Sequence, residues 1–299
     1  MTIMNSPTFS APALPAITIG MPVFNGEASV RQAIESMLNQ TFGDFELIVS
    51  DNASTDRTQQ ICRDCAEADP RVRYIRQPIN LGAEGNFRFV FRQARSEYFM
   101  WAAADDLRSA GFLETNLAFL REHPDYSGST CPVRFIGGDF DEIKMGDKSL
   151  ASDDPHQRLT DFFRTWHANG RYYSLFRRAD IEDWKFLNDM SFLASDWTLV
   201  LHMATKGKLN RLSSGWVELG RDGFSSKVDL FSYYRKNWVD WLFPFNRLTI
   251  YTLRQVWPCS RLTAGSLLGT LLGLNASAFR AQFVARRTRS RPPIRSQPE

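Results

Sequence analysis

Two adjacent acidic residues, Asp105 and Asp106, follow an apolar run in the segment WAAADDLRS. Neighbouring carboxylates are costly in a folded protein unless water or a cation compensates their charge. A hard divalent ion binds carboxylate and phosphate oxygens together, and it can neutralise the diphosphate of a leaving nucleotide. The pair therefore indicates a metal-assisted diphosphate site, although an exposed acidic cap on the next helix would also explain it.

Polar residues also end two earlier apolar runs. In the segment DNASTD, Asp51 can accept the ring N–H of a pyrimidine, while Asn52 and Ser54 are types that favour a helix start. In the segment PVFNG, Pro22 ends strand pairing, and Asn25 with the glycine after it favours a tight turn. An ordinary helix cap and an ordinary turn are the alternatives.

Two further segments contain residues suited to contact a ligand or to move a proton. Gly82, in the segment NLG, permits close approach of the backbone to a ligand, and Asn86 follows it in the chain. Asp196 stands at the start of a helical pattern, where the helix dipole stabilises a carboxylate that can take a proton from an attacking hydroxyl. A turn and a common helix-terminal acid are the alternatives.

Strand-like and helix-like segments alternate in the N-terminal part of the chain. Apolar runs predict strands over residues 16–21, 45–50, 72–76 and 98–103. Helical spacing predicts helices over residues 27–39, from Ser54 or Thr55 to Ala68, and over residues 85–95. This alternation indicates an α/β fold with a mostly parallel sheet covered on both faces. The polar residues then meet at the carboxyl edge of the sheet, where such folds bind ligands.

The second half of the chain is less regular. We expect an acidic loop over residues 137–155, a helix over 195–206, and strands over 169–176, 208–212 and 216–219. Aromatic-rich helices begin near Leu230. An uncharged stretch over residues 262–279 holds Gly265, Gly269 and Gly273 at four-residue spacing, a pattern that lets helices approach closely.

Composition limits the class of protein. The 299 residues carry a formal net charge of +3, which suits one large α/β domain with extensions and does not indicate a nucleic-acid partner. Cys62 and Cys65 form a CxxC, but no second pair completes a zinc site, so we expect reduced thiols in a cytoplasmic protein. Residues 1–15 are expected to be a flexible leader without a signal peptide.

The order and spacing of these motifs resemble those of a known family. The segments ITIGMPVFNGEASVRQAIESMLNQTFGDFELIVSDNASTDRT and INLGAEGNFRFVFRQARSEYFMWAAADD are similar to family 2 glycosyltransferases of the GT-A fold. The later stretch FLASDWTLVLHMATKGKLNRLS resembles the acceptor-side region of that family. The resemblance covers residues 17 to about 219. It implies a nucleotide-sugar pocket lined by Pro22, Phe24, Asn25, Asp51, Asn52, Ser54, Gly82, Asn86 and Asp105.

The resemblance also implies roles in catalysis. Asp106, with Asp105 beside it, would hold Mn2+ or Mg2+ against the diphosphate, and Asp196 would be the general base of an inverting displacement. Arg221 and Trp197 would face the acceptor. Two departures bear on this: the family commonly has an acid where this chain has Ala103-Ala104, and many relatives have a histidine where this chain has Gly223. The first leaves open which aspartate binds the metal, and the second puts acceptor contacts of that loop in doubt.

The predicted activity is transfer of a sugar, most often from a UDP-sugar, to a hydroxyl of a glycan or lipid-linked acceptor in surface polysaccharide synthesis. A nucleotidyltransferase is an alternative, but it would normally begin with a basic, glycine-rich phosphate loop, and the segment PVFNG has no lysine or arginine. A non-catalytic protein that binds nucleotide-sugars is a second alternative. A dinucleotide-dependent oxidoreductase is disfavoured because no glycine fingerprint follows the first strand.

The C-terminal part departs from the resemblance. We divide the chain into a leader (1–15), a GT-A domain (16–228), an aromatic-rich helical extension (229–283) and a basic disordered tail (284–299). The extension can complete the acceptor site, lie on the inner face of the cell membrane, or form a homodimer. Peripheral membrane attachment is the first choice, because tryptophans and tyrosines suit the interface and arginines suit anionic lipid.

Overall fold

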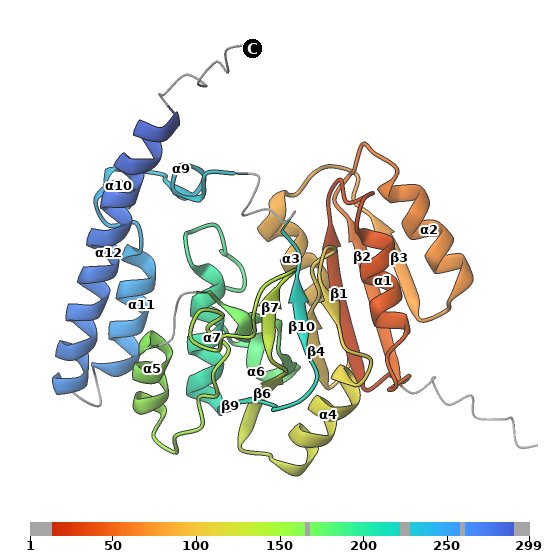
Figure 1. Ribbon diagram of the computed structural model, residues 1–299, viewed down its shortest axis with the longest axis horizontal. Coiled ribbons are helices and arrows are strands. Elements are labelled where there is room, and N and C mark those ends of the chain that lie inside the picture. The colour runs from red at the N-terminus through yellow and green to blue at the C-terminus, as the bar shows by residue number, and fades with distance from the viewer. Residues whose placement is uncertain (1–13, 165–167, 222–227, 258–260, 290–299) are drawn as a thin grey trace, which may run out of the picture.

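The computed structural model describes residues 14–164, 168–221, 228–257 and 261–289 (Figure 1). Within them the main sheet has the strand order β3-β2-β1-β4-β8-β6-β9. Strands β1 to β4 are parallel, β8 runs antiparallel to β4 and β6, and β9 is parallel to β6. The strands are β1 (Ile17–Val23), β2 (Phe45–Asp51), β3 (Val72–Arg76), β4 (Tyr98–Trp101), β6 (Tyr126–Thr130), β8 (Leu175–Arg177) and β9 (Lys208–Arg211).

A small second sheet brings distant segments together beside the acid pair. It has the order β5-β10-β7, from β5 (Leu107–Arg108), β7 (Val133–Phe135) and β10 (Val217–Leu219). Strand β5 begins directly after Asp106, and β10 ends directly before Gly220. Because β5 and β10 pair antiparallel, the carboxyl end of β10 lies next to the acid pair.

Helices cover both faces of the main sheet. They are α1 (Val30–Leu38), α2 (Thr58–Ala68), α3 (Gly82–Gln93), α4 (Phe112–Glu122), α5 (Pro155–Arg164), α6 (Arg178–Glu182) and α7 (Ser195–Lys206), with a 3-10 helix η1 (Gly170–Tyr173). Alternate strand residues serve the two faces: Met100 packs with α1, α2 and α4, whereas Phe99 and Trp101 pack with α3, α5 and α7. The α/β fold with a mostly parallel sheet is therefore confirmed.

Several element boundaries differ from those predicted. Strand β1 continues through Pro22, which pairs with Ser50, to Val23, so the expectation that this proline ends strand pairing is wrong. Helix α2 begins at Thr58, so Ser54 and Thr55 do not cap it; the Ser54 hydroxyl instead accepts a hydrogen bond from the Asn25 N–H at 2.9 Å. Helix α3 begins at Gly82 rather than Gly85. The predicted strand over residues 169–176 is wrong in its first part, because residues 170–173 form η1 and only β8 follows as strand.

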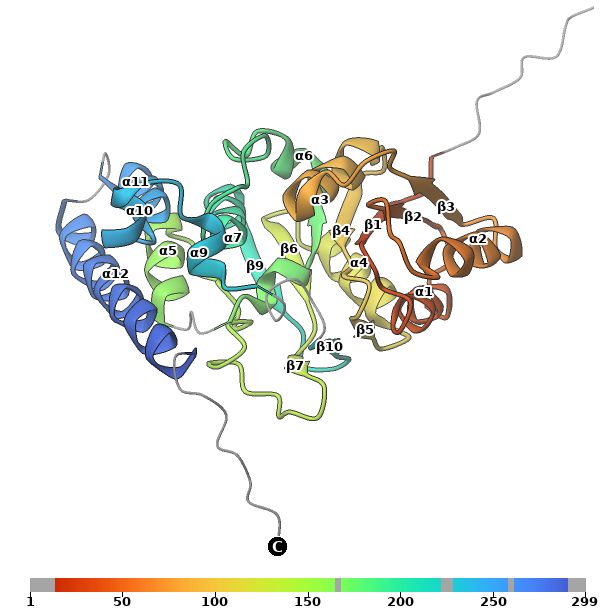
Figure 2. The ribbon, with the colours of Figure 1, turned by 90° about the horizontal axis from the view of Figure 1, so that it is seen from above.

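The C-terminal extension consists of α9 (Leu230–Tyr234), α10 (Trp238–Leu242), α11 (Asn246–Val256) and α12 (Arg261–Arg289). In two views these helices lie beside α5 and α7, at the end of the molecule away from α1 and α2 (Figures 1 and 2). Helix α11 packs on α7, and α12 packs on α5 and α11. Buried residues such as Leu248 and Leu271 continue the core that α7 begins. The predicted aromatic-rich helices are thus confirmed as packed helices.

The predicted glycine stripe of α12 does not meet another helix within the described residues. A Cβ added at Gly265, Gly269 or Gly273 would have no atom within 4 Å. The stripe therefore faces outward. The span Arg261–Gln282 within this helix is long and apolar enough to cross a membrane by length and composition, and 33% of its most apolar window is buried. A packed surface helix passes the same test.

Candidate functional site

The loops after β1, β2 and β4 lie together at the carboxyl edge of the main sheet. The Asn52 N–H donates to the carbonyl of Val23 at 2.8 Å, which joins the first two loops. A Cβ added at Gly26 would lie 4.0 Å from the Ala104 Cβ, so the first loop also contacts the segment that carries the acid pair. The predicted convergence of polar residues at this edge is confirmed.

Asn25 connects the first loop to the second. It has a positive φ of 49°, and its side-chain oxygen accepts the Thr55 N–H at 2.8 Å. The Gly26 N–H donates to the Thr58 hydroxyl at 2.8 Å. Phe24 is 46% exposed beside this turn, whereas Pro22 is buried within β1. A ligand can therefore reach Phe24, whereas Pro22 is covered, and the predicted contact of both residues with a nucleoside stays a prediction.

Asp51 ends β2 with its carboxylate fully occupied by neighbours. One oxygen accepts the Ser54 N–H at 2.8 Å, and the other accepts the Tyr74 hydroxyl at 2.8 Å and Arg76 Nη1 at 2.6 Å. The Asp51 side chain is 0% exposed, whereas that of Arg76 is 34% exposed. A base could therefore reach the Asp51 carboxylate only if Arg76 or Tyr74 moved aside. Neither of these two residues is among those predicted from the sequence.

Buried amides shape the loop that carries Gly82. Asn52 Nδ2 donates to Asn80 Oδ1 at 2.9 Å and to the Gly82 carbonyl at 3.1 Å, and Asn52 Oδ1 accepts the Leu81 N–H at 2.8 Å. Gly82 has a positive φ of 76°. Asn86 bonds both the hydroxyl and the carbonyl of Ser50. Asn52 and Asn86 therefore fix the backbone of this loop, and their predicted contact with a nucleotide stays a prediction.

The acid pair is divided between a buried and a part-exposed residue. Asp106 is 3% exposed, and its Oδ1 accepts the Gly220 N–H at 3.0 Å. Its Oδ2 is buried and has no hydrogen-bond partner among the described residues. Burial raises the pKa of the Asp106 carboxyl to about 7, against the opposing charge of the buried Arg108 guanidinium. Asp105 lies against Gly220, where an added Cβ would collide with its carboxylate and carbonyl oxygens.

The donor atoms of the pair fit a hard divalent cation. They are carboxylate oxygens, and the buried Asp106 Oδ2 lacks the partner that a cation would supply. No group of three or more His, Cys, Asp or Glu side chains suited to a metal is present within the described ranges. Phosphate and water oxygens would therefore have to complete the coordination, as is usual for magnesium.

Asp196 lies in the first turn of α7, after a backbone reversal at Ala194, whose φ is 64°. Asn169 Nδ2 donates to Asp196 Oδ2 at 2.9 Å. Burial raises the pKa of the Asp196 carboxyl, while the hydrogen bond from Asn169 opposes that shift. The Trp197 ring stacks on Phe245 at 5.7 Å, so the structure uses it in packing, and its acceptor role stays a prediction.

Tyr173 links the acid pair to Asp196. Burial raises the pKa of its hydroxyl well above the usual range, and the negative charges of Asp106, Asp196 and Asp105 raise it further. The 3-10 helix η1 that carries Tyr173 packs on both β4 and α7, so it lies between the strand that leads into the acid pair and the helix that carries Asp196. Tyr173 belongs to η1, the segment for which the sequence predicted a strand.

Arg221 is exposed at the end of β10, one residue after the glycine that contacts the acid pair. Its predicted contact with the acceptor stays a prediction. Asp222 and Gly223, on which the second departure from the family pattern rests, lie outside the described residues.

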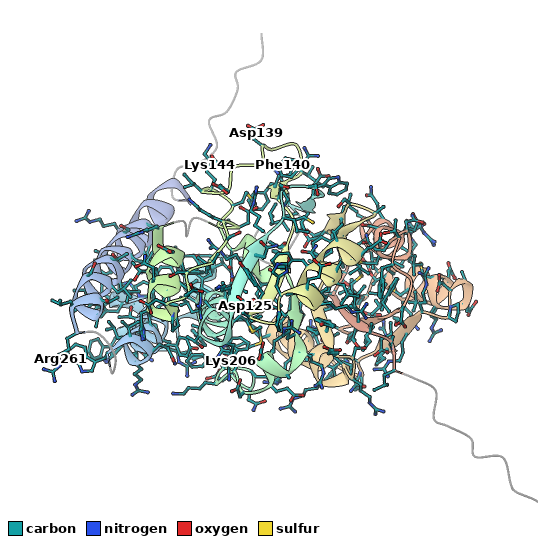
Figure 3. The ribbon with its side chains drawn as sticks, turned by 90° about the horizontal axis from the view of Figure 1, so that it is seen from below. Asp125, Asp139, Phe140, Lys144, Lys206 and Arg261 are labelled. Carbon is teal, nitrogen blue, oxygen red and sulfur yellow. The ribbon has the colours of Figure 1, made fainter. Side chains whose placement is uncertain are left out.

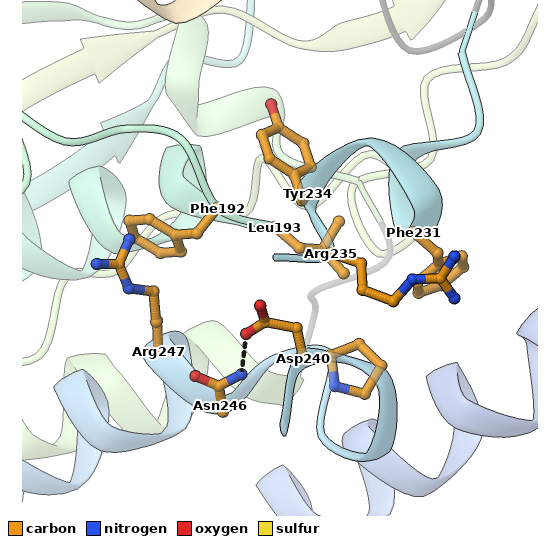
Figure 4. A pocket seen from close by; sticks show the side chains of 9 residues that line it. Phe192, Leu193, Phe231, Tyr234, Arg235, Asp240, Asn246 and Arg247 are labelled. Atoms are coloured by element: carbon orange, nitrogen blue, oxygen red, sulfur yellow. Dashed lines mark hydrogen bonds between the residues drawn. The ribbon is translucent and has the colours of Figure 1, made fainter. Parts of the chain in front are cut away.

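The extension packs tightly on the loop before Asp196. A cavity of about 10 Å³ lies between Phe192, Tyr234, Asp240 and Arg247, room for roughly one water molecule (Figure 4). Lys236 Nζ donates to the Ser191 hydroxyl at 2.7 Å, and Arg247 pairs with Asp189 at 2.8 Å. The extension therefore fixes the loop that leads into the candidate base.

The sheet, the acid pair after β4 and the small second sheet define the chain as a GT-A protein. A structure of Staphylococcus aureus TarS with UDP-GlcNAc matches with a TM-score of 0.62 and 16% identity, over 86% of this chain and 71% of that one. The Pyrobaculum calidifontis mannosyltransferase PcManGT, with GDP-Man and Mn2+, matches with a TM-score of 0.55 and 16% identity, over 93% and 86%. At these identities the likeness shows the fold alone.

A model of glycosyl transferase family 2 matches residues 18–184, which is more than half of the chain. The chain belongs to glycosyltransferase family 2. A Campylobacter jejuni GalNAc(5)-diNAcBac-PP-undecaprenol beta-1,3-glucosyltransferase is 27% identical over 64% of this chain and 60% of its own length. Glycosyltransferase GlyA of Streptococcus pneumoniae is 30% identical over 72% of this chain and 34% of its own length. The matches therefore span less than two thirds of these relatives.

Proposed function

We propose that this chain is an inverting glycosyltransferase that moves a sugar from a nucleoside-diphosphate sugar to an acceptor hydroxyl. The observation that carries the proposal is the buried Asp106 carboxylate held by the Gly220 N–H at the carboxyl edge of a GT-A sheet, with η1 packed on both β4, which leads into the acid pair, and α7, which carries Asp196. This arrangement supports a diphosphate site and a proton acceptor at the same edge of the sheet. Membership of family 2 supports the same reaction class.

Asp105 and Asp106 would hold Mn2+ or Mg2+ in this proposal. The ion would supply charge neutralisation for the departing diphosphate. The chain's own contribution is to fix the two carboxyls. The Gly220 N–H orients Asp106, and the close approach of the Gly220 backbone orients Asp105.

Asp196 is the proposed general base. Its carboxylate would accept the proton of the acceptor hydroxyl as that oxygen attacks the anomeric carbon, and the nucleotide would leave from the opposite face. Asn169 orients this carboxylate through the hydrogen bond to Oδ2. A carboxyl with a raised pKa is a better proton acceptor than an ordinary aspartate.

UDP-sugar is the proposed donor, with Asp51 and Arg76 at the base. The TarS complex with UDP-GlcNAc supports this choice, whereas the complex of PcManGT with GDP-Man shows that the fold also accommodates guanine. The part-exposed Arg76 would face the base, and the buried Asp51 would hold Arg76 in place.

The proposed acceptor is a glycan or lipid-linked glycan in surface polysaccharide synthesis, supported by the undecaprenol-linked acceptor in the name of the Campylobacter relative. We further propose that the extension contacts an anionic membrane. Residues 229–299 contain eleven lysines and arginines and three acids. Trp238 is 71% exposed and Leu262 is 89% exposed on the extension. This combination favours the interface of an anionic bilayer.

A screen of nucleotide-sugars tests the proposed function. The purified chain would be incubated with each donor and Mn2+, and release of the nucleoside diphosphate would be measured with and without Asp196→Asn. We expect one UDP-sugar to be consumed by the parent faster than by the variant. If no donor is consumed or transferred under any condition, the proposed enzyme activity is wrong.

A further inference from the structure

Glu84 stands in the first turn of α3, in the loop that Asn52 and Asn86 fix. Hydrogen bonds at Gly82 and Asn86, on either side of Glu84 in the chain, therefore fix its backbone position. Gly82, the first residue of α3, has a positive φ, and the first turn of the helix follows the carboxyl end of β3, at the same edge of the sheet as the acid pair.

One oxygen of the Glu84 carboxylate accepts no hydrogen bond from the described residues. Its Oε1 is buried and has no hydrogen-bond partner among the residues that the structure describes. Its Oε2 accepts the Tyr233 hydroxyl at 3.4 Å, a long contact. An ionised carboxylate only accepts hydrogen bonds, and a buried acceptor without a donor is costly. A ligand hydroxyl or amide N–H would supply the missing donor.

Helix α9 connects this carboxylate to the candidate base. The hydroxyl of Tyr234 is close enough to Glu84 and to Asp196 for both charges to raise its pKa, in addition to the effect of burial. In Figure 4 the Tyr234 ring extends to the opposite side of the cavity from Asp240 and Asn246. The contact between Tyr233 and Glu84 thus joins α9 to α3, and Tyr234, the next residue of α9, lies within electrostatic reach of both Glu84 and Asp196.

We propose that Glu84 accepts a hydrogen bond from a hydroxyl or amide group of the transferred sugar, and so determines which donor sugar is used. This inference rests on the proposed function, because it places the sugar between the acid pair and Asp196. Tyr233 holds the carboxylate from the extension side. The site then recognises the sugar through a side chain that the family resemblance did not point to.

The test compares Glu84→Gln with the parent and with the matched control Glu122→Gln, an exposed acid on α4. Glu84→Gln keeps the size but replaces an acceptor-only group by an amide. We expect kcat/KM for the preferred UDP-sugar to fall by at least about tenfold, while the Kd for UDP changes less than about twofold, because UDP lacks the sugar. The control should match the parent in both.

A second arm uses a UDP-sugar analogue that lacks one hydroxyl, tested for each sugar position. The parent should discriminate against one such analogue, and Glu84→Gln should lose most of that discrimination. Unchanged kcat/KM and unchanged discrimination in Glu84→Gln would overturn the inference. An equal loss of UDP affinity would overturn it too, since Glu84 would then only shape the nucleotide loop. A parent that binds no nucleotide would overturn the proposed function together with this inference.

Discussion

The Asp196 carboxyl belongs to a part-buried residue in the first turn of α7. Burial raises its pKa, and the Asn169 amide partly restores the charged form. A base must be deprotonated to act, so the active form is present above this raised pKa and is lost as the pH falls through it. Asn169 and Asp196 are 27 residues apart, so only the fold brings them into contact.

We therefore expect kcat to fall on the acid side at a pH above the ordinary pKa of an aspartate. Asp196→Asn should lower kcat by roughly 10²–10⁴-fold and leave a pH-independent remainder, because a positioned base contributes about that factor. The Kd for UDP should stay within about twofold. A pH profile of the parent and the variant measures this, and an Asp196→Asn variant with parental kcat would contradict the assignment.

Gly220 allows its backbone to lie close to Asp105 because it has no side chain. A Cβ there would collide with the carboxylate and carbonyl oxygens of Asp105, whereas a Cβ at Gly43 would meet nothing within 4 Å. Gly220→Ala should displace the acid pair and weaken Mn2+-dependent UDP binding by at least about tenfold, with strain of about 1–3 kcal/mol in stability. Gly43→Ala is the matched control. Equal UDP affinity in the two variants would show that Asp105 does not need this contact.

At the scale of elements, the strands and their carboxyl ends could be predicted from sequence because local apolar runs determine them. Strands β1 to β4 and helix α7 follow the predicted positions within a few residues. The partners of the site residues could not be predicted. Arg76 reaches Asp51 from 25 residues away, and Gly220 reaches Asp106 from 114 residues away. Such pairs depend on strand order rather than on local pattern.

The predicted start of α2 and the predicted strand over residues 169–176 were wrong for physical reasons. Ser54 has the side chain of a good helix cap, but its hydroxyl bonds the neighbouring loop, and the helix begins later. The residues of η1 include two tyrosines, which favour a strand by propensity. There Tyr172 stacks on Trp101 at 5.3 Å in the core, and tertiary packing determines the backbone instead.

The conformation of the loop that carries Gly82 should depend on the side chain of Asn52. Asn52→Ala removes three hydrogen bonds from a residue that is 3% exposed. We expect a loss of about 1–3 kcal/mol in the free energy of unfolding and weaker UDP binding. Urea unfolding of this variant and of Gln60→Ala, an exposed control on α2, measures the loss. If both variants unfold at the same urea concentration, Asn52 does not hold the loop.

At the scale of the molecule, positive charge and exposed apolar residues are concentrated in the extension. The whole chain has a net charge of +3, whereas residues 229–299 alone contain eleven lysines and arginines and three acids. Residues 1–228 therefore have a net negative charge. This separation would orient the extension toward an anionic surface. Figure 3 shows Arg261 of the extension and Phe140 of the loop after β7 at different edges of the molecule.

Sedimentation with lipid vesicles tests this orientation. The chain should bind vesicles that contain anionic lipid, and binding should weaken as salt is raised, because each basic residue near the surface contributes about 1 kcal/mol. Trp238→Ser combined with Leu262→Ser should reduce binding severalfold. Phe140→Ser, also an exposed aromatic at 43%, should not. Equal binding to neutral vesicles, or none to either kind, would contradict membrane attachment.

Calorimetric titration of UDP into the chain, with and without Mn2+, tests most directly whether the acid pair and a divalent cation hold the nucleotide diphosphate. We expect Mn2+ to raise the affinity of the parent for UDP by at least about tenfold. Asp105→Asn and Asp106→Asn should each remove that increase while leaving the metal-independent affinity within about twofold. Parental Mn2+-dependent binding in both variants would place the diphosphate elsewhere and contradict the account.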